Sequence, residues 1–203
     1  MSFNTYGQRK RTGTAEYAVW AEVNGRKSGG GTVDGFDEMP VGTVIPAGTP
    51  VHLDKSGGTI KVLKTYRVAK KVSNATAVYI NAIDGVPAKD SFVAVLSDIT
   101  GSGNGLKVSA VASEADREVK LTLGEAVTLE AGDVLVEVDK AGEGAVAKVV
   151  PNGLIWNDIV KEEGDTVATG AVVDVGRVYA DRTPPISQAI KNHLVTIKFE
   201  EGL

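Results

Sequence analysis

The sequence predicts a mainly β fold, and its composition and its turn spacing lead to that prediction. The chain has 203 residues, with 24 Gly but only 4 Phe and 2 Trp, so its 42% hydrophobic content comes mainly from Val, Ala, Leu and Ile. Branched aliphatic residues favour strands, and glycine favours the turns between them. Turn signals recur roughly every ten residues from Met39 onward, which is typical of sandwiches and barrels. A chain of this length can bury a core without disulfides, and it has no cysteine.

The amino-terminal part of the chain is predicted to be an extended arm followed by a loop. Residues Met1–Thr14 are polar and show no hydrophobic periodicity, so nothing local would order them. Tyr17–Val23 has the pattern of a short strand, while Asn24–Asp37 contains the glycines Gly29–Gly31 and is expected to be a loop. We therefore expect residues 1–38 to form an arm and a loop outside the main β domain.

Most of the remaining chain is predicted to form strands joined by glycine and proline turns. The clearest hairpin joins Val51–Leu53 to Thr59–Leu63 through the turn Lys55–Gly58. Further strands are expected at Val44–Ile45, Tyr66–Val72, Ala77–Ile80, Phe92–Leu96, Leu106–Val111 and Glu118–Leu123, with Gly101–Gly105 as a flexible connection.

One short helix is predicted near the carboxyl end of the chain. It follows the Pro184–Pro185 pair, and Ile186, Ile190 and Leu194 mark one face at helical spacing. Val195–Phe199 then returns to an extended pattern.

Charge and hydropathy argue against two classes of partner. The formal net charge is −4 at neutral pH, whereas phosphate binding needs a concentrated basic surface, so no nucleic-acid partner is expected. The basic cluster Arg9–Arg11 could contact an acidic partner, although clusters of this kind in polar termini are usually solvated. No apolar run approaches the roughly 20 residues that cross a bilayer, and Met1–Lys10 lacks the apolar core of a secretory signal. We therefore expect no membrane partner and synthesis in the cytoplasm.

The two histidines lie apart from any recognisable nucleophile motif, although a catalytic triad needs a base placed beside its nucleophile. His52 falls between Val51 and Leu53 in a predicted strand, so its side chain should point away from the face that these two share. His193 is expected to close the short helix, where a cation is favourable. Neither histidine is expected to act in catalysis.

Carboxylates gather in places that match no known binding pattern. These groups comprise Asp34, Asp37 and Glu38; Glu162, Glu163 and Asp165; and Glu200 with Glu201. Their spacing does not match a calcium-binding loop, so solvated turns are expected. Gly101–Gly105 does not open a phosphate-binding loop, because the following residues Leu106–Val108 have the pattern of a strand. The sequence therefore predicts no catalytic residues, no cofactor and no metal.

Two stretches far apart in the sequence share the pattern of a known family. The first is Pro46–Asp54, with the sequence PAGTPVHLD, followed by the hairpin through Val62. The second is Pro151–Ile159, with the sequence PNGLIWNDI, followed by Val172–Pro184, with the sequence VVDVGRVYADRTP. Together these stretches resemble the lambda-type head decoration proteins and the related head fibre proteins of tailed bacteriophages.

This resemblance implies a fold and a partner. The implied fold is a small β-barrel or β-tulip-like decoration domain made of residues 39–65 and 149–203, with an inserted β subdomain at 66–148. The insertion departs from the compact members of the family, in which a short connection joins the two stretches. The implied function is that of a virion protein, without catalysis, that binds the outer surface of a preformed capsid. Its partners would be the major capsid protein and two further copies in a homotrimer.

On this hypothesis, the amino-terminal arm makes the capsid contacts. An arm of this kind can order on binding, and Tyr17–Val23 would pair with the edge of a neighbouring sheet. Trp20 could equally belong to the core of the protein. The candidate capsid-interface residues are Phe3, Tyr6, Arg9, Lys10, Arg11, Tyr17 and Trp20.

Two other functions stay open from the sequence. In the first, the chain is a carbohydrate- or receptor-binding β module, with residues 66–148 as an exposed adhesion head. Such sites use aromatic platforms, and this segment offers Tyr66, Tyr79 and Phe92. The second is a small β-barrel enzyme, which the missing catalytic constellation disfavours.

Overall fold

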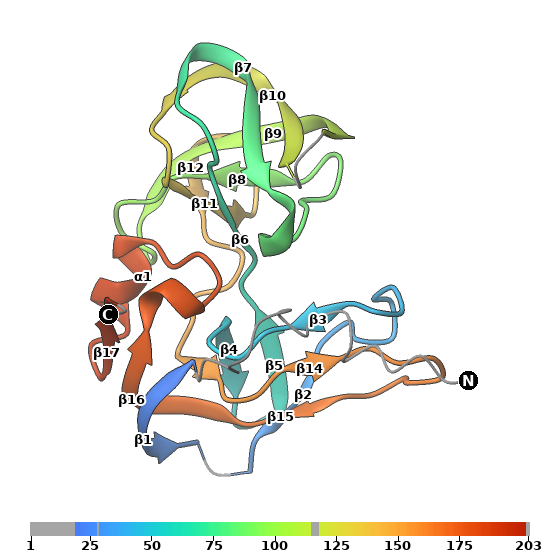
Figure 1. The fold of residues 1–203 in the computed structure, drawn as a ribbon, viewed down its shortest axis with the longest axis vertical. Coiled ribbons are helices and arrows are strands. Elements are labelled where there is room, and N and C mark those ends of the chain that lie inside the picture. The colour runs from blue at the N-terminus through green and yellow to red at the C-terminus, as the bar shows by residue number, and fades with distance from the viewer. Residues whose placement is uncertain (1–18, 28, 115–117, 202–203) are drawn as a thin grey trace, which may run out of the picture. The chain divides into compact units, whose positions relative to one another are not determined.

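The computed structural model describes residues 19–27, 29–114 and 118–201, and it is mainly β, with 52% strand and 6% helix. The prediction of a mainly β fold is therefore confirmed. The chain forms two compact units, shown in Figure 1. The first unit comprises Met1–Val62, Pro151–Thr183 and Thr196–Leu203, and the second comprises Leu63–Val150 and Pro184–Val195.

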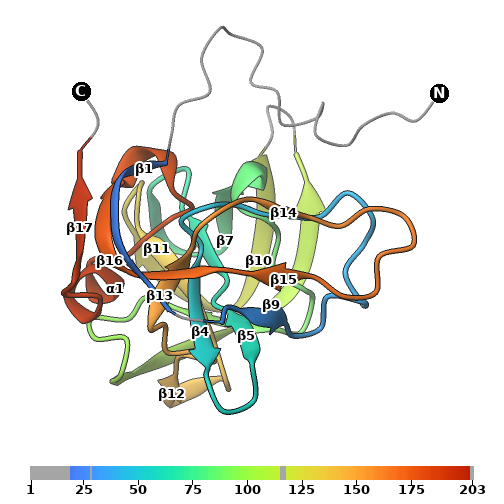
Figure 2. The ribbon, with the colours of Figure 1, turned by 90° about the horizontal axis from the view of Figure 1, so that it is seen from below.

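The first unit is built on an 8-stranded sheet, drawn from below in Figure 2. The strand order is β1-β16-β13-β4-β5-β2-β15, and β17 pairs with β16 on the side away from β1. A 2-stranded ribbon of β3 and β14 completes the unit. The strands are β1 (Trp20–Arg26), β2 (Gly31–Val33), β3 (Val44–Ile45), β4 (Pro50–Asp54), β5 (Thr59–Val62), β13 (Gly153–Ile155), β14 (Ile159–Val160), β15 (Thr169–Gly170), β16 (Val172–Tyr179) and β17 (Ile197–Glu200), and the 3-10 turn η3 (Ala180–Arg182) follows β16.

The hairpin predicted around residue 55 is confirmed as β4 and β5. The two strands pair antiparallel, with Val51 opposite Val62 and Leu53 opposite Ile60. Val51, Leu53 and Ile60 are buried, whereas His52 is only half-buried, so the imidazole lies on the other face as expected. The core beneath the hairpin consists of Val33, Phe36, Ile45, Val51, Leu53, Ile60, Ile155 and Val172.

The short strand β13 joins the two halves of the first unit. Gly153 lies opposite Val51 of β4 in one ladder, and Leu154 lies opposite Val173 of β16 in the other. A Cβ atom on Gly153 would stand 2.5 Å from Cγ1 of Val172 and 2.6 Å from the carbonyl oxygen of Val173. Glycine at this position therefore allows β16 to approach β13 closely.

Side chains near β13 extend this pairing beyond the strand. The amide of Asn152 accepts a hydrogen bond from the Leu53 N–H at 2.9 Å and donates one to the Leu53 carbonyl at 3.0 Å. The Asp158 carboxylate accepts a hydrogen bond from the Ala47 N–H at 2.7 Å. The Ile155 carbonyl accepts another from the Gly48 N–H at 2.8 Å. Residues more than 90 positions apart are thus locked together by polar contacts as well as by apolar burial.

The second unit is built on a 7-stranded sheet in the order β6-β11-β8-β9-β10-β7, with β12 paired to β9. The sheet curls until its two end strands approach one another. An isolated bridge joins Val68 to Ile80, and the Ala69 N–H donates to the Tyr79 carbonyl at 2.7 Å. The strands are β6 (Thr65–Arg67), β7 (Val72–Asn81), β8 (Phe92–Ala94), β9 (Ser102–Ser113), β10 (Glu118–Leu129), β11 (Val134–Val138) and β12 (Gly142–Val146), and the 3-10 turn η2 (Ala82–Asp84) follows β7.

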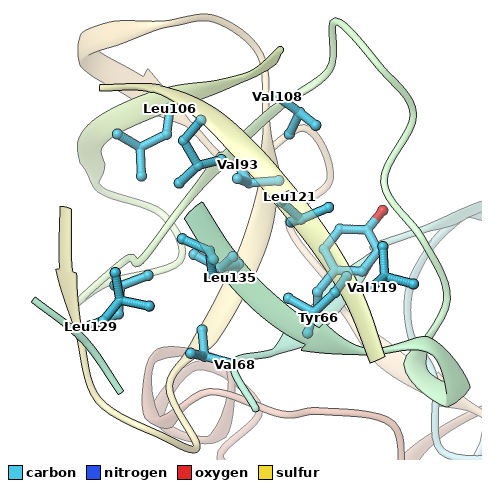
Figure 3. Packing of buried hydrophobic residues seen from close by; sticks show 13 residues of the cluster. Tyr66, Val68, Val93, Leu106, Val108, Val119, Leu121, Leu129 and Leu135 are labelled. Atoms are coloured by element: carbon cyan, nitrogen blue, oxygen red, sulfur yellow. The ribbon is translucent and has the colours of Figure 1, made fainter. Parts of the chain in front are cut away.

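Aliphatic side chains and one tyrosine fill the inside of the curled sheet, as Figure 3 shows. Leu121 and Leu135 are fully buried at its centre, and the ring of Tyr66 lies beside Val119. Tyr66 is 2% exposed, and burial, followed by the nearby Glu137 carboxylate, raises the pKa of its phenol well above the ordinary 10.0. The neutral phenol is therefore part of the core.

Alkaline pH is expected to destabilise the protein through Tyr66. A raised folded-state pKa stabilises the fold fully below the unfolded value of 10.0, and this stabilisation is lost as the pH rises through the folded value. Tyr66→Phe should therefore lose less free energy of unfolding than the wild type between about pH 9 and about pH 11. Urea unfolding at the two pH values measures the difference. Equal losses in the two proteins would show that Tyr66 ionises without cost.

The predicted short helix is confirmed as α1 (Gln188–His193), the one α-helix among the described residues. Ser187 caps it, because its hydroxyl accepts a hydrogen bond from the Ile190 N–H at 3.3 Å. His193 is the last residue of the helix, as expected. The sequence placed residues 184–195 in the domain made of 39–65 and 149–203, whereas Pro184–Val195 groups with Leu63–Val150 in the second unit. Within that unit, Ala189 shares a hollow with Leu96 and Val134.

Two expectations about loops are wrong. The expected loop Asn24–Asp37 contains the end of β1 and all of β2, because Thr32 and Val33 donate to the distant carbonyls of Gly58 and Ala168. Residues 20–26 and 31–33 thus belong to the main sheet rather than to an arm.

The expected flexible connection Gly101–Gly105 is mostly strand. Gly103 and Gly105 lie in β9 and face β12, where Gly105 is opposite Gly142. A Cβ atom on Gly105 would stand 2.0 Å from the Lys140 carbonyl oxygen, so this glycine permits a close approach of the backbones. The residues that follow, Leu106–Val108, are also strand, as predicted.

Candidate docking surface

Trp20 is the one residue of the predicted capsid interface that lies in the described structure. The other six fall outside the described residues: Phe3, Tyr6, Arg9, Lys10, Arg11 and Tyr17. Trp20 opens β1, directly after the amino-terminal segment. The expected strand Tyr17–Val23 was assigned to a neighbouring sheet, but its described part pairs with β16 of the same chain.

The strand β1 forms an irregular edge of the sheet. Its pairing with β16 shifts register between Trp20 and Glu22, between Val23 and Gly25, and between Gly25 and Arg26. Bulges of this kind twist an edge away from further strand pairing. The surface around β1 is therefore better suited to contacts through side chains than to the addition of another strand.

Ion pairs cover one part of this edge. The Arg177 guanidinium of β16 approaches the Glu22 carboxylate at 3.8 Å and donates through Nε to the Glu200 carboxylate at 2.8 Å. The hydrogen bond and the charge of Glu200 raise the pKa of Arg177. Because all three side chains are substantially exposed, this network contributes little to stability and leaves Arg177 already paired.

The two tryptophans of the chain meet on the other part of the edge. The Trp20 indole donates from Nε1 to the Trp156 carbonyl at 2.8 Å. Trp156 follows β13, and its own N–H donates to the Ala171 carbonyl at 3.0 Å. Both indoles are half-buried. Trp20 is thus held by its own unit while part of its ring stays at the surface.

Arg26 stacks on Trp156. Its guanidinium carbon lies 3.9 Å from the centroid of the Trp156 ring, which is the geometry of a cation–π contact. Arg26 is exposed and forms no ion pair with any residue in the described part of the chain. Stacking therefore orders a guanidinium whose donors remain available to a partner.

A hollow of about 500 Å³ lies between the loop before β2, the β4–β5 turn and the strand β15. The backbone of Ala171, one of the lining residues, accepts a hydrogen bond from the Trp156 N–H. Glycine at position 30 lets its backbone approach β15 closely, since a Cβ atom on Gly30 would stand 2.5 Å from the Gly170 carbonyl oxygen. The hollow is lined by Gly29, Gly30, Gly31, Thr32, Gly58, Thr169, Gly170 and Ala171.

Two lysines add positive charge near this hollow. Lys27 follows Arg26, and Lys55 belongs to the same turn as the lining residue Gly58. Partial burial is the main cause that lowers the pKa of Lys27; Asp174 opposes this shift and Lys55 adds to it. Lys27 and Lys55 are therefore close enough to repel one another, and Asp174 is the carboxylate that offsets them.

Two of the three carboxylate groups seen in the sequence lie on exposed turns, whereas Glu200 of the third is half-buried in β17 and pairs with Arg177. Asp34, Asp37 and Glu38 are exposed, and so are Glu162, Glu163 and Asp165. The Asp165 carboxylate accepts from the Glu162 N–H at 3.0 Å and closes its own turn. Among the described residues, no group of three or more His, Cys, Asp or Glu side chains is placed to hold a metal ion.

Lys161 links the turn Glu162–Asp165 to the core of the first unit. Its ammonium donates to the Asp165 carbonyl and lies 4.7 Å from the centroid of the Phe36 ring. Lys161 is 5% exposed, so its charge is offset by these contacts rather than by water. Lys161 therefore helps to hold the turn at residues 162–165 in place.

The three aromatic residues of the second unit do not form a common platform. Tyr66 is buried in the core. Tyr79 is half-buried beneath the Lys70 ammonium, which lies 4.9 Å from its ring centroid, and Phe92 is half-buried on β8. Tyr66 is therefore removed from the candidates for ligand stacking.

Sequence reasoning missed Arg26 and Trp156 as a pair. Trp156 lies in a stretch noted for its family pattern, and Arg26 was assigned to a loop. Their contact depends on β1 and β13 lying on opposite sides of β16, which no local pattern reveals. The one available signal was a tryptophan that follows a buried strand and precedes the polar residues Asn157 and Asp158.

Comparisons with models of known protein families, with curated proteins and with solved structures found no match for this chain. None of the helices in the described ranges is long and apolar enough to cross a membrane. The functional argument therefore rests on the residues and on their arrangement in the first unit.

Proposed function

We propose that this chain is a structural protein that binds the outer surface of a phage capsid and stabilises the mature head. Its amino-terminal arm attaches it to the shell, the major capsid protein is its partner, and it assembles as a homotrimer. The proposed fold of the first unit is the decoration-type β domain. The protein acts without a cofactor or a catalytic step.

The observation that supports this proposal most is the mutual packing of the family-like stretches. Pro46–Asp54, Pro151–Ile159 and Val172–Pro184 contribute the adjacent strands β4, β13 and β16. The Asn152 amide bonds both backbone groups of Leu53, and the Asp158 carboxylate bonds the Ala47 N–H. A pattern shared at separated positions is expected when those positions form one folded domain.

Placement of the edge strand is consistent with attachment by an arm. β1 begins at Trp20, the second described residue of the chain, and it belongs to the first unit. A segment that leaves the sheet at this point can reach a neighbouring surface while the unit stays folded. Ordering such a segment costs conformational entropy, which contacts with the shell would have to offset.

Stabilisation of the head would follow from selective binding. A protein that binds the mature lattice more tightly than the immature one favours the mature state by mass action. Three arms in one trimer would add avidity, because each contact after the first becomes intramolecular. This function requires binding and no catalytic reaction.

Deletion of Met1–Thr14 is expected to abolish capsid binding while leaving the protein folded. The deletion removes none of the described strands, so the thermal midpoint should stay within about 2 °C of the wild-type value. Co-sedimentation with mature capsids that lack the chain measures binding. Full-affinity binding of the truncated protein would contradict attachment by the arm.

Two matched variants separate the contributions within the arm. Phe3→Ala with Tyr6→Ala removes the aromatic anchors, whereas Arg9→Ala with Lys10→Ala and Arg11→Ala removes the positive charge. If the anchors dominate, the aromatic variant should lose more affinity at every salt concentration. The basic variant should differ from the wild type only at low salt.

The alternative function is a carbohydrate- or receptor-binding module. Tyr79 and Phe92 retain partial exposure in the second unit and support it weakly, whereas Tyr66 is buried. Binding of the purified protein to a glycan array would favour this alternative over capsid attachment.

A further inference from the structure

Three asparagine residues of the chain are followed directly by glycine: Asn24, Asn104 and Asn152. An asparagine in this position can lose its side-chain amide without an enzyme, because the backbone nitrogen of the next residue attacks the side-chain carbonyl carbon. Glycine favours this attack, since it has no side chain in the way and reaches backbone conformations that other residues avoid. The three pairs are alike in sequence, so the fold determines which of them reacts.

Asn24 is the extra residue of a bulge in β1. Val23 lies opposite Gly176 of β16 and Gly25 lies opposite Val175, so no residue of β16 is paired with Asn24. A second register shift follows directly after Gly25. The ladder is locally disrupted at a bulge, and Asn24 is also exposed. The backbone of this pair can therefore change conformation without breaking a regular run of strand pairing.

Asn104 is also exposed, but its backbone is held by a neighbouring strand. It lies opposite Glu143 in the ladder of β9 and β12. The following Gly105 is buried, and a Cβ atom on it would stand 2.0 Å from the Lys140 carbonyl oxygen. Attack by the Gly105 nitrogen therefore requires β9 and β12 to separate locally, which costs free energy.

Asn152 is held by its side chain as well as by its backbone. Its amide is bonded to both the N–H and the carbonyl of Leu53, and its own N–H donates to the Val51 carbonyl at 2.9 Å. Gly153 is buried and pairs within the main sheet of the first unit. Attack at Asn152 would therefore require all of these bonds to break.

We propose that Asn24 is a site of spontaneous deamidation in the folded protein. The Gly25 nitrogen attacks the side-chain carbonyl carbon of Asn24 and gives up its proton, the bond from that carbon to the amide nitrogen breaks, and ammonia leaves. Water then opens the resulting succinimide to aspartate or isoaspartate, so water is the one co-reactant. This modification site goes beyond the proposed function and does not depend on it.

Deamidation changes the charge of the β1 edge. The Asn24 amide donates to the Glu22 carboxylate at 2.8 Å, and that carboxylate approaches the Arg177 guanidinium at 3.8 Å. A carboxylate at position 24 accepts but does not donate, so the reaction removes this hydrogen bond and places a second negative charge beside Glu22. The product therefore differs from the starting protein by one negative charge on an exposed edge.

Peptide mapping by mass spectrometry tests the proposal on the full-length protein, incubated at mildly alkaline pH. Asn24 should lose its amide at least about tenfold faster than Asn104 or Asn152, because a paired strand reaches the reactive conformation only by local opening. In guanidinium chloride the three sites should react at similar rates. The proposal fails if Asn104 or Asn152 reacts as fast as Asn24 in the folded protein. It also fails if Asn24 stays intact there while all three sites react in the unfolded chain.

Hydroxylamine gives a second readout, because it cleaves the main chain where a succinimide forms. The folded wild type should be cut selectively between Asn24 and Gly25, into fragments of residues 1–24 and 25–203. Asn24→Gln is the matched control, since it keeps the amide but its longer side chain does not readily close the ring. Circular dichroism shows that this variant is folded. Cleavage of Asn24→Gln at this position at the wild-type rate would contradict a succinimide at Asn24.

Discussion

Replacing Gly153 by alanine is expected to lower the free energy of unfolding by about 3 kcal/mol, near the upper end of the cost of overpacking a core. The added Cβ would stand 2.5 Å from Cγ1 of Val172 and 2.6 Å from the Val173 carbonyl oxygen. The oxygen belongs to the backbone of β16, so the clash is relieved only if β13 and β16 separate. Urea unfolding followed by far-ultraviolet circular dichroism measures the loss.

Gly124→Ala is the matched control for this prediction. Gly124 lies in strand β10, and the nearest atom to an added Cβ is 3.6 Å away, which is an ordinary contact. The free energy of unfolding of Gly124→Ala should therefore equal or slightly exceed that of the wild type, because alanine restricts the unfolded chain more than glycine does. Equal effects of the two substitutions would show that close packing of β13 on β16 is unimportant.

Asn152→Ala is expected to cost about 2 to 4 kcal/mol of stability, because it leaves two backbone groups without partners. The Asn152 amide satisfies both the N–H and the carbonyl of Leu53, at 2.9 Å and 3.0 Å. Leu53 is 2% exposed, so water does not readily replace the lost partner. Thermal and urea unfolding should agree on the size of the effect.

Asn157→Ala is the control for Asn152, because Asn157 is exposed in the same stretch of sequence. It should change stability by less than about 0.5 kcal/mol. If Asn157→Ala reduces capsid binding while Asn152→Ala leaves both stability and binding intact, the family-like stretch would be a contact surface rather than a structural joint.

Local patterns were sufficient to predict several elements of the fold. The β4–β5 hairpin has a compact turn at Lys55–Gly58 between apolar runs, and both strands formed where expected. The helix α1 follows a proline pair and has a serine cap, so its existence also followed from nearby residues. The burial of Val51 and Leu53 beside half-buried His52 followed from strand alternation.

Elements that depend on distant partners were not predictable in the same way. β2 is three residues long, and its backbone bonds to Gly58 and Ala168 rather than to its neighbours in sequence. The glycines of β9 have the composition of a flexible linker, yet they allow close contact with β12. Composition alone does not distinguish a glycine that frees the chain from one that lets two backbones approach.

Contacts on the candidate docking surface also depend on residues that are distant in sequence. Trp20 was predicted as an interface or core residue; its indole bonds the Trp156 carbonyl of its own unit while the residue stays half-buried, and its interface role stays a prediction. The stacking of Arg26 on Trp156 joins residues 130 positions apart through the shared neighbour β16. Such a contact follows from sheet order, which the sequence alone did not provide.

Imaging of phage particles with and without this chain tests the proposed function most directly. Particles that carry the chain should show additional density on the outer capsid surface at symmetry axes, and particles that lack it should show a bare shell. Adding back the purified wild type should restore the density, whereas adding back the protein without Met1–Thr14 should not. Identical outer surfaces in all of these particles would contradict a role in capsid decoration.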